Sequence, residues 1–134
     1  MKNKNDLVQE WIKKAEQDFR SAEILLNSGE NDIPYASVCF HCQQSAEKYL
    51  KAYCVQLDID FPKTHNLSDL LVIISKKDTS LLKFENKLET LTPYAVDIRY
   101  PDDEYSIPKD TAAEALQIAN EIKELVLKNI SENI

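Results

Sequence analysis

The most restrictive feature of this sequence is its single glycine, Gly29, in a chain of 134 residues. The tight turns that join neighbouring β-strands usually need residues with positive φ, and glycine adopts that conformation most readily. A strand-rich fold would therefore lack turn residues. Long stretches rich in Lys, Glu, Leu and Ala favour helix instead. We predict an all-α protein.

Apolar residues recurring at the helical period divide the chain into five predicted helices. They cover approximately residues 6–27, 34–57, 67–75, 79–98 and 109–130, with an interruption at Pro93 in the fourth. The connections are short, and no linker separates two domains. We therefore predict one domain over residues 1–134, an up-and-down bundle of four long helices plus a short one.

Charge and hydropathy narrow the class of protein. The net charge is −7. This charge argues against a surface that binds nucleic acid non-specifically, but it does not exclude a local basic site. No apolar run approaches the roughly 20 residues of a membrane span. The polar residues 1–10 do not resemble a secretory signal. We expect a cytoplasmic protein that does not enter a membrane.

The second predicted helix carries the best candidate binding surface. His41, Gln44, Lys48 and Lys51 gather within an arc of roughly 80°, on the opposite side from the apolar stripe. Two ammonium groups and two neutral hydrogen-bonding side chains could hold a phosphate and contact a base or sugar edge. The alternative is an ordinary solvated face, which is common opposite an apolar stripe.

Four sequence elements, in order along nearly the whole chain, resemble the HEPN family. Residues 39–52 read CFHCQQSAEKYLKA, which is similar to the family's aromatic-His-x-x-Gln lead followed by Ala-Glu-Lys and Leu-Lys-Ala. The other elements are Ala15 to Asp18 with Ala22, Thr64-His65-Asn66-Leu67, and Asp97-Ile98-Arg99-Tyr100-Pro101. The last of these resembles the family's Arg-Tyr-Pro element.

The resemblance implies a dimeric helical bundle that binds nucleotides or acts on RNA. Many relatives are encoded beside a minimal nucleotidyltransferase, and some are ribonuclease toxins of toxin–antitoxin pairs. We expect a homodimeric nucleotide- or nucleic-acid-phosphate-binding module, without a cofactor, that acts with a separate nucleotidyltransferase. The expected ligand-binding residues are His41, Gln44, Lys48, Lys51, Arg99 and Tyr100.

The chain departs from the pattern of the ribonuclease relatives, which carry Arg-x4-6-His. After Arg99 the corresponding positions hold Glu104, Tyr105 and Ser106. This departure favours a protein that is not an enzyme. The alternative is a metal-independent ribonuclease in which Arg99 stabilises the scissile phosphate and Tyr105 or His41 transfers protons.

Two further interpretations apply to the same residues. Arg99 could form an internal ion pair with Asp18 or Asp97 instead of binding phosphate. The whole protein could also be a non-catalytic dimeric interaction protein, which would show a large apolar surface patch.

No metal site is predicted. The acidic run at residues 102–104 matches no metal-binding loop. Cys39-x-x-Cys42 resembles half of a zinc site, but no second pair follows and both thiols lie on the apolar stripe. Together with Cys54 they make an odd count, which suits reduced thiols in the core.

Overall fold

The computed structural model describes residues 2–95 and 107–132. Within these residues there are helices and no strands, so the predicted all-α class is confirmed. The helices are α1 (Lys4–Leu26), α2 (Tyr35–Gln56), α3 (Leu67–Ser75), α4 (Glu85–Leu91) and α5 (Lys109–Glu132). Two 3-10 turns flank α4: η1 (Leu82–Phe84) and η2 (Thr92–Ala95).

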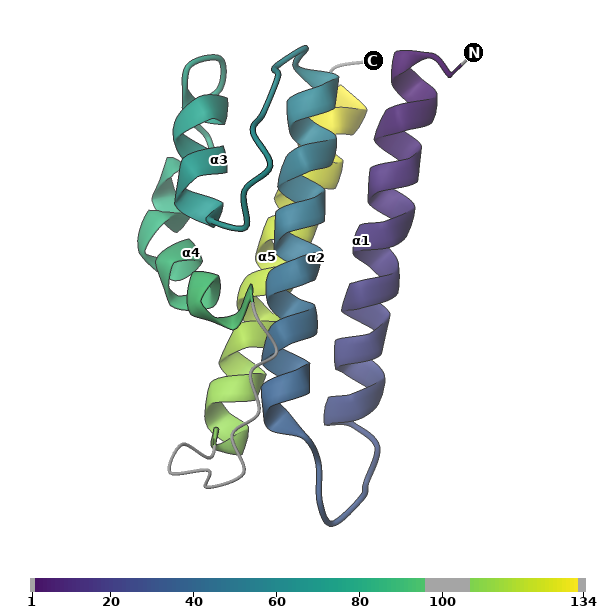
Figure 1. The fold of residues 1–134 in the computed structure, drawn as a ribbon, viewed down its shortest axis with the longest axis vertical. Coiled ribbons are helices and arrows are strands. Elements are labelled where there is room, and N and C mark those ends of the chain that lie inside the picture. Colours follow the sequence, from purple (N-terminus) through teal and green to yellow (C-terminus); the bar gives the residue numbers. More distant parts are fainter. Residues whose placement is uncertain (1, 96–106, 133–134) are drawn as a thin grey trace.

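The three long helices lie side by side, and α2 is central (Figure 1). In that view α1 lies on one side of α2, α3 and α4 lie on the other, and α5 passes behind it. Contacts join α2 to α1, α3, α4, η2 and α5. The helix that carries the candidate residues is therefore also the helix around which the other elements pack.

Burial along α2 follows from this central position. Its fully buried side chains include Val38, Cys42, Tyr49 and Leu50. A helix surrounded on most sides needs apolar or internally paired residues around most of its circumference. Little of α2 remains to face solvent, and in the middle of the helix that remainder includes the polar residues His41, Gln44 and Lys48.

Local capping signals explain why α1 and α3 begin where they do. Asn3 accepts a hydrogen bond from the backbone N–H of Asp6 at 2.8 Å, and the Asp6 carboxylate accepts one from the backbone of Asn3. Asn66 caps α3 by accepting bonds from the backbone N–H groups of Ser68 and Asp69. These side chains satisfy N–H groups that a helix start leaves without partners.

The fourth segment was predicted as a helix from about residue 79 with an interruption at Pro93, and the structure divides it further. In the described residues it consists of η1, α4 and η2, although Leu81, Leu88 and Leu91 are buried as their spacing predicted. Pro93 lies in η2, where its missing N–H ends the regular α-helical pattern. The sequence thus predicted the buried face and the break at Pro93, but not the 3-10 turn η1 before α4.

None of the helices in residues 2–95 and 107–132 combines the length and the hydropathy needed to cross a membrane.

Candidate functional site

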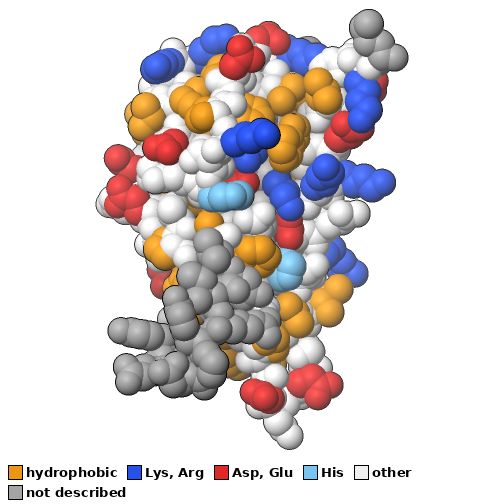
Figure 2. Space-filling model, viewed as in Figure 1, with side chains coloured by type: hydrophobic (Ala, Val, Ile, Leu, Met, Phe, Trp, Pro, Cys, Tyr) orange, Lys and Arg blue, Asp and Glu red, His pale blue; other side chains and the backbone are white. Residues whose placement is uncertain are grey.

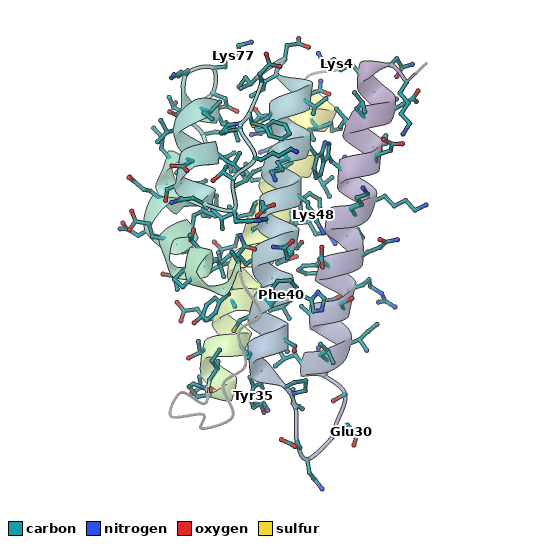
Figure 3. All side chains as sticks on the ribbon, in the orientation of Figure 1. Lys4, Glu30, Tyr35, Phe40, Lys48 and Lys77 are labelled. Carbon is teal, nitrogen blue, oxygen red and sulfur yellow. The ribbon has the colours of Figure 1, made fainter. Side chains whose placement is uncertain are left out.

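Three polar residues in the middle of α2 are partly exposed: His41, Gln44 and Lys48, which we call the polar strip. All three side chains are half-buried. Lys48 projects toward α1 (Figure 3). Sequence analysis grouped Lys51 with these residues, but its side chain is only 10% exposed. The predicted face therefore exists, yet one of its four residues is inside the protein.

One carboxylate on α1 holds two residues of the polar strip. Asp18 Oδ1 lies 2.9 Å from His41 Nδ1, and Asp18 Oδ2 accepts a hydrogen bond from Lys48 Nζ. The Asp18 side chain is only 13% exposed. We call Asp18, His41 and Lys48 the Asp18 network. It orients the imidazole of His41 and leaves Nε2 without a hydrogen-bond partner among the described residues.

A second carboxylate organises the neighbouring turn of α2. The buried Glu47 accepts hydrogen bonds from Lys51 Nζ at 2.9 Å and from Gln43 Nε2 at 3.3 Å, and His65 Nδ1 lies 2.9 Å from its Oε1. We call Gln43, Glu47, Lys51 and His65 the Glu47 network. It explains the burial of Lys51, since a buried ammonium group requires a charged partner.

Gln44 joins the Glu47 network. Its Nε2 donates to Gln43 Oε1 at 2.7 Å, and Gln43 Nε2 donates to the backbone carbonyl of His65 at 2.9 Å. The link fastens the loop before α3 to the middle of α2. Of the candidate residues on α2, Gln44 and Lys51 therefore belong to the Glu47 network, and His41 and Lys48 belong to the Asp18 network.

Sequence analysis did not select Gln43 and Glu47 as site residues, although a signal was present. Gln43 falls between Leu50 and Cys54 when α2 is viewed along its axis, so it lies inside the apolar arc. A polar residue in an apolar arc is buried and must find a hydrogen-bond partner. Glu47 lies four residues after Gln43 and four before Lys51, the spacing at which helical side chains meet.

An aromatic pair adjoins the Glu47 network. The rings of Trp11 on α1 and Phe61 in the loop before α3 meet edge to face, with centroids 6.1 Å apart. Lys51 Nζ lies 5.6 Å from the centroid of Trp11 and 5.7 Å from that of Phe61. Lys14 Nζ lies 6.0 Å from the Trp11 centroid. Two cations thus flank one half-buried aromatic pair.

Cys39 and Cys42 are buried, as their positions on the apolar stripe predicted. Cys39, Cys42 and Cys54 are free thiols and fully buried. Burial raises the pKa of Cys39 to about 11 and that of Cys54 to about 12, so both stay protonated near neutral pH. No group of three or more potential metal ligands occurs in residues 2–95 and 107–132. The interpretation as core thiols is confirmed.

Several sequence candidates lie outside the described residues. They are Arg99, Tyr100 and Tyr105, together with Asp97 and the acidic run at residues 102–104. Their roles remain predictions from the sequence.

The described surface mixes charge and apolar groups. Both histidines lie on the face shown in Figure 2, and Lys and Arg side chains gather beside them. Among the described residues the exposed large apolar side chains are Leu7, Ile24, Val72 and Leu82, distributed over α1, α3 and η1. This distribution gives less support to an interaction protein that works through one apolar patch.

Comparison with known proteins agrees with the fold. The family model described as "HEPN domain" matches residues 8–130. The crystal structure of TT1696 from Thermus thermophilus is similar, with a TM-score of 0.75 and 26% identity over 95% of this chain and 98% of that one. ST0689, an archaeal HEPN homologue, has a TM-score of 0.74 and 26% identity over 97% and 99% of the two chains. The search of curated proteins found no match.

Proposed function

This chain belongs to the HEPN domain family, and from that premise we propose that it is a nucleotide-binding module whose polar strip recognises phosphate. The observation that carries the proposal is the Asp18 network. It holds both His41 and Lys48, whose half-buried side chains lie on the polar strip of α2, through the same carboxylate.

The donors on the polar strip are suited to an anion. A lysine ammonium has three N–H groups, of which Asp18 engages one on Lys48. His41 offers Nε2, and Gln44 retains one amide N–H beyond its bond to Gln43. Phosphate oxygens accept several such bonds at once, and bonds that involve charged groups are the stronger ones. Asp18 also repels an anion, which favours ligands that offer hydrogen-bonding groups besides phosphate.

Arg99 and Tyr100 complete the proposed site. Arg99 follows Ala95, the end of η2, by four residues, and η2 contacts α2. A guanidinium binds phosphate through two parallel hydrogen bonds, which a lysine cannot do. The proposal therefore joins one planar cation from the segment after η2 to the donors of the polar strip.

The proposed cellular role follows the family resemblance. The protein acts in the cytoplasm as a partner of a separate minimal nucleotidyltransferase, in a pair of the toxin–antitoxin kind. In this role it binds the nucleotide or RNA and carries out no chemistry itself.

Ligand-induced thermal stabilisation tests the binding function. A nucleotide at about 100 times its dissociation constant should raise the free energy of unfolding by about 2.7 kcal/mol, which shifts the melting temperature by several degrees. Lys48→Gln and Arg99→Gln each remove a charge and should reduce affinity about tenfold or more, since charge-assisted bonds contribute roughly 1.5 to 3 kcal/mol. The measurement is a melting curve for each variant with and without nucleotide.

Lys123→Gln is the matched control. Lys123 also forms an ion pair with a carboxylate on α1, Glu16 at 2.8 Å, but from α5. Its ligand-induced shift should equal that of the unaltered protein. A panel of nucleotides and single-stranded RNA that produces no shift would rule out the proposal.

A metal-independent ribonuclease is the second candidate, and the Asp18 network also favours it. A carboxylate that fixes one ring nitrogen of a histidine leaves the other available for proton transfer. Here that nitrogen is Nε2 of His41. Cleavage of the RNA in the same panel, lost in His41→Gln, would establish this candidate in place of simple binding.

We also propose that the protein is a homodimer, as the family resemblance implies. Sedimentation equilibrium at micromolar concentration should give twice the mass of the chain. A monomer at that concentration would contradict the proposal and would exclude a site shared between two protomers. The exposed Leu7 and Ile24 on α1 are the apolar side chains that a partner could cover.

A further inference from the structure

We propose that Trp11 and Phe61 form a platform on which an unpaired nucleobase stacks while its phosphate binds the polar strip. This inference rests on the proposed function and adds to it the part of the ligand that gives selectivity. The ligand class is a base carried on a phosphate, either as a mononucleotide or within a single strand.

The two parts of this site are continuous along the same pair of helices. Trp11 and Asp18 are seven residues apart on α1, a rise of about 10.5 Å at 1.5 Å per residue. The helix α2 runs antiparallel to α1 (Figure 1). Its Lys48 contacts Asp18 and its Lys51 lies over Trp11, so both parts of the site lie between the same two helices. Gln44 of the polar strip is joined to Lys51 through Gln43 and Glu47.

The aromatic pair is fixed by its surroundings. Phe61 meets Trp11 at an interplanar angle of 71°, so the edge of one ring faces the plane of the other. Lys51 is held beside both rings by its bond to the buried Glu47. A stacking surface that is already ordered loses little conformational freedom when a ligand binds.

Lys14 distinguishes this pair from a sealed core contact. It is exposed, and its ammonium group lies 6.0 Å from the Trp11 ring, so solvent reaches this side of the ring. A cation–π contact at an exposed site is weaker than the stacking of a base on an aromatic ring. A base can therefore replace Lys14 over Trp11.

The combination of aromatic rings and cations along one face is typical of proteins that bind single strands. The bases of a duplex are already stacked on one another, so a duplex cannot use the platform. The net charge of −7 also disfavours a ligand bound through its backbone alone. Base stacking supplies affinity that the limited positive charge of this face cannot supply.

Trp11 makes the test direct, because it is the only tryptophan in the chain. Its fluorescence is followed while the full-length protein is titrated with the four nucleoside monophosphates, with a single-stranded hexaribonucleotide, and with inorganic phosphate. The base-bearing ligands should quench the emission in a saturable way, and phosphate should leave it unchanged. Quenching by the hexanucleotide alone would identify a single strand as the ligand, and quenching by the monophosphates would identify a free nucleotide.

Variants measure how much the platform contributes. Trp11→Leu keeps an apolar side chain but removes the π-face, and should weaken binding of a dye-labelled hexanucleotide about 5- to 150-fold. Trp11→Phe keeps a smaller ring and should weaken it less. Val72→Leu, at an exposed apolar position on α3, is the control and should bind as the unaltered protein does. Far-UV circular dichroism and melting curves confirm that each variant is folded.

The outcomes separate this inference from the function on which it rests. Binding of the labelled ligand with unchanged Trp11 emission and no effect of Trp11→Leu would overturn the platform and leave phosphate binding by the polar strip intact. No binding of any nucleotide or RNA would overturn both. Saturable quenching of Trp11, with binding of the labelled hexanucleotide that is lost in excess unlabelled single strand but not in excess duplex, would support the platform.

Discussion

Glu47→Leu is expected to lower the free energy of unfolding by about 3 to 5 kcal/mol, because it leaves the ammonium of Lys51 buried without its carboxylate. The two side chains are only 4% and 10% exposed, so water does not replace the lost partner. The same change removes the acceptor for Gln43 and His65. Urea unfolding followed by circular dichroism gives the value directly.

Two controls show whether burial is the cause. Glu121 pairs with Lys87 at 2.8 Å, but these side chains are 28% and 48% exposed, so Glu121→Leu should cost less than about 1 kcal/mol. Lys51→Met combined with Glu47→Leu removes both charges and should recover much of the lost stability. A cost below about 1 kcal/mol for Glu47→Leu alone would mean that Lys51 reaches solvent freely.

Leu50→Ala is expected to lower the free energy of unfolding by about 2 to 5 kcal/mol. Leu50 is fully buried in α2, the helix that contacts all the other helices, so the surrounding side chains have little room to close a cavity. Domains are usually stable by only about 5 to 15 kcal/mol, so this one change removes a large part of the total. The measurement is again urea unfolding.

Leu50→Met and Val72→Ala test the cavity explanation. Methionine nearly conserves the volume of leucine and should cost less than about 1.5 kcal/mol. Val72 is 58% exposed, so its truncation should change stability by no more than about 0.5 kcal/mol. Equal losses for Leu50→Ala and Leu50→Met would contradict the explanation.

The sequence predicted the helices well because each one is defined by its own local pattern. The predicted bounds of α3, residues 67–75, agree with the structure, and α1, α2 and α5 agree to within a few residues. The fourth segment was less predictable. Its apolar spacing continues through residues that form 3-10 turns, and spacing alone does not distinguish a continuous helix from a broken one.

The candidate site was predicted in part, and Lys51 shows why. Helical periodicity gives the direction of a side chain on its own helix, but not which other elements pack against that side. The loop that carries Phe61 and His65 covers Lys51, and nothing in the sequence of α2 predicts that loop's position. Asp18 stood at the margin of the apolar stripe of α1, and only the packing of α1 on α2 joins it to His41 and Lys48.

The central position of α2 also predicts how ligand binding should change amide hydrogen exchange. Amide hydrogen exchange is slowest in elements that open only when the whole domain unfolds, and a helix packed on most sides is such an element. The polar strip is therefore carried by one of the last parts of the protein to open, and its side chains are already ordered by Asp18 and Gln43. A ligand on this strip meets a rigid receptor. Its binding should slow exchange throughout the bundle by raising the free energy of global opening, rather than by ordering a local segment.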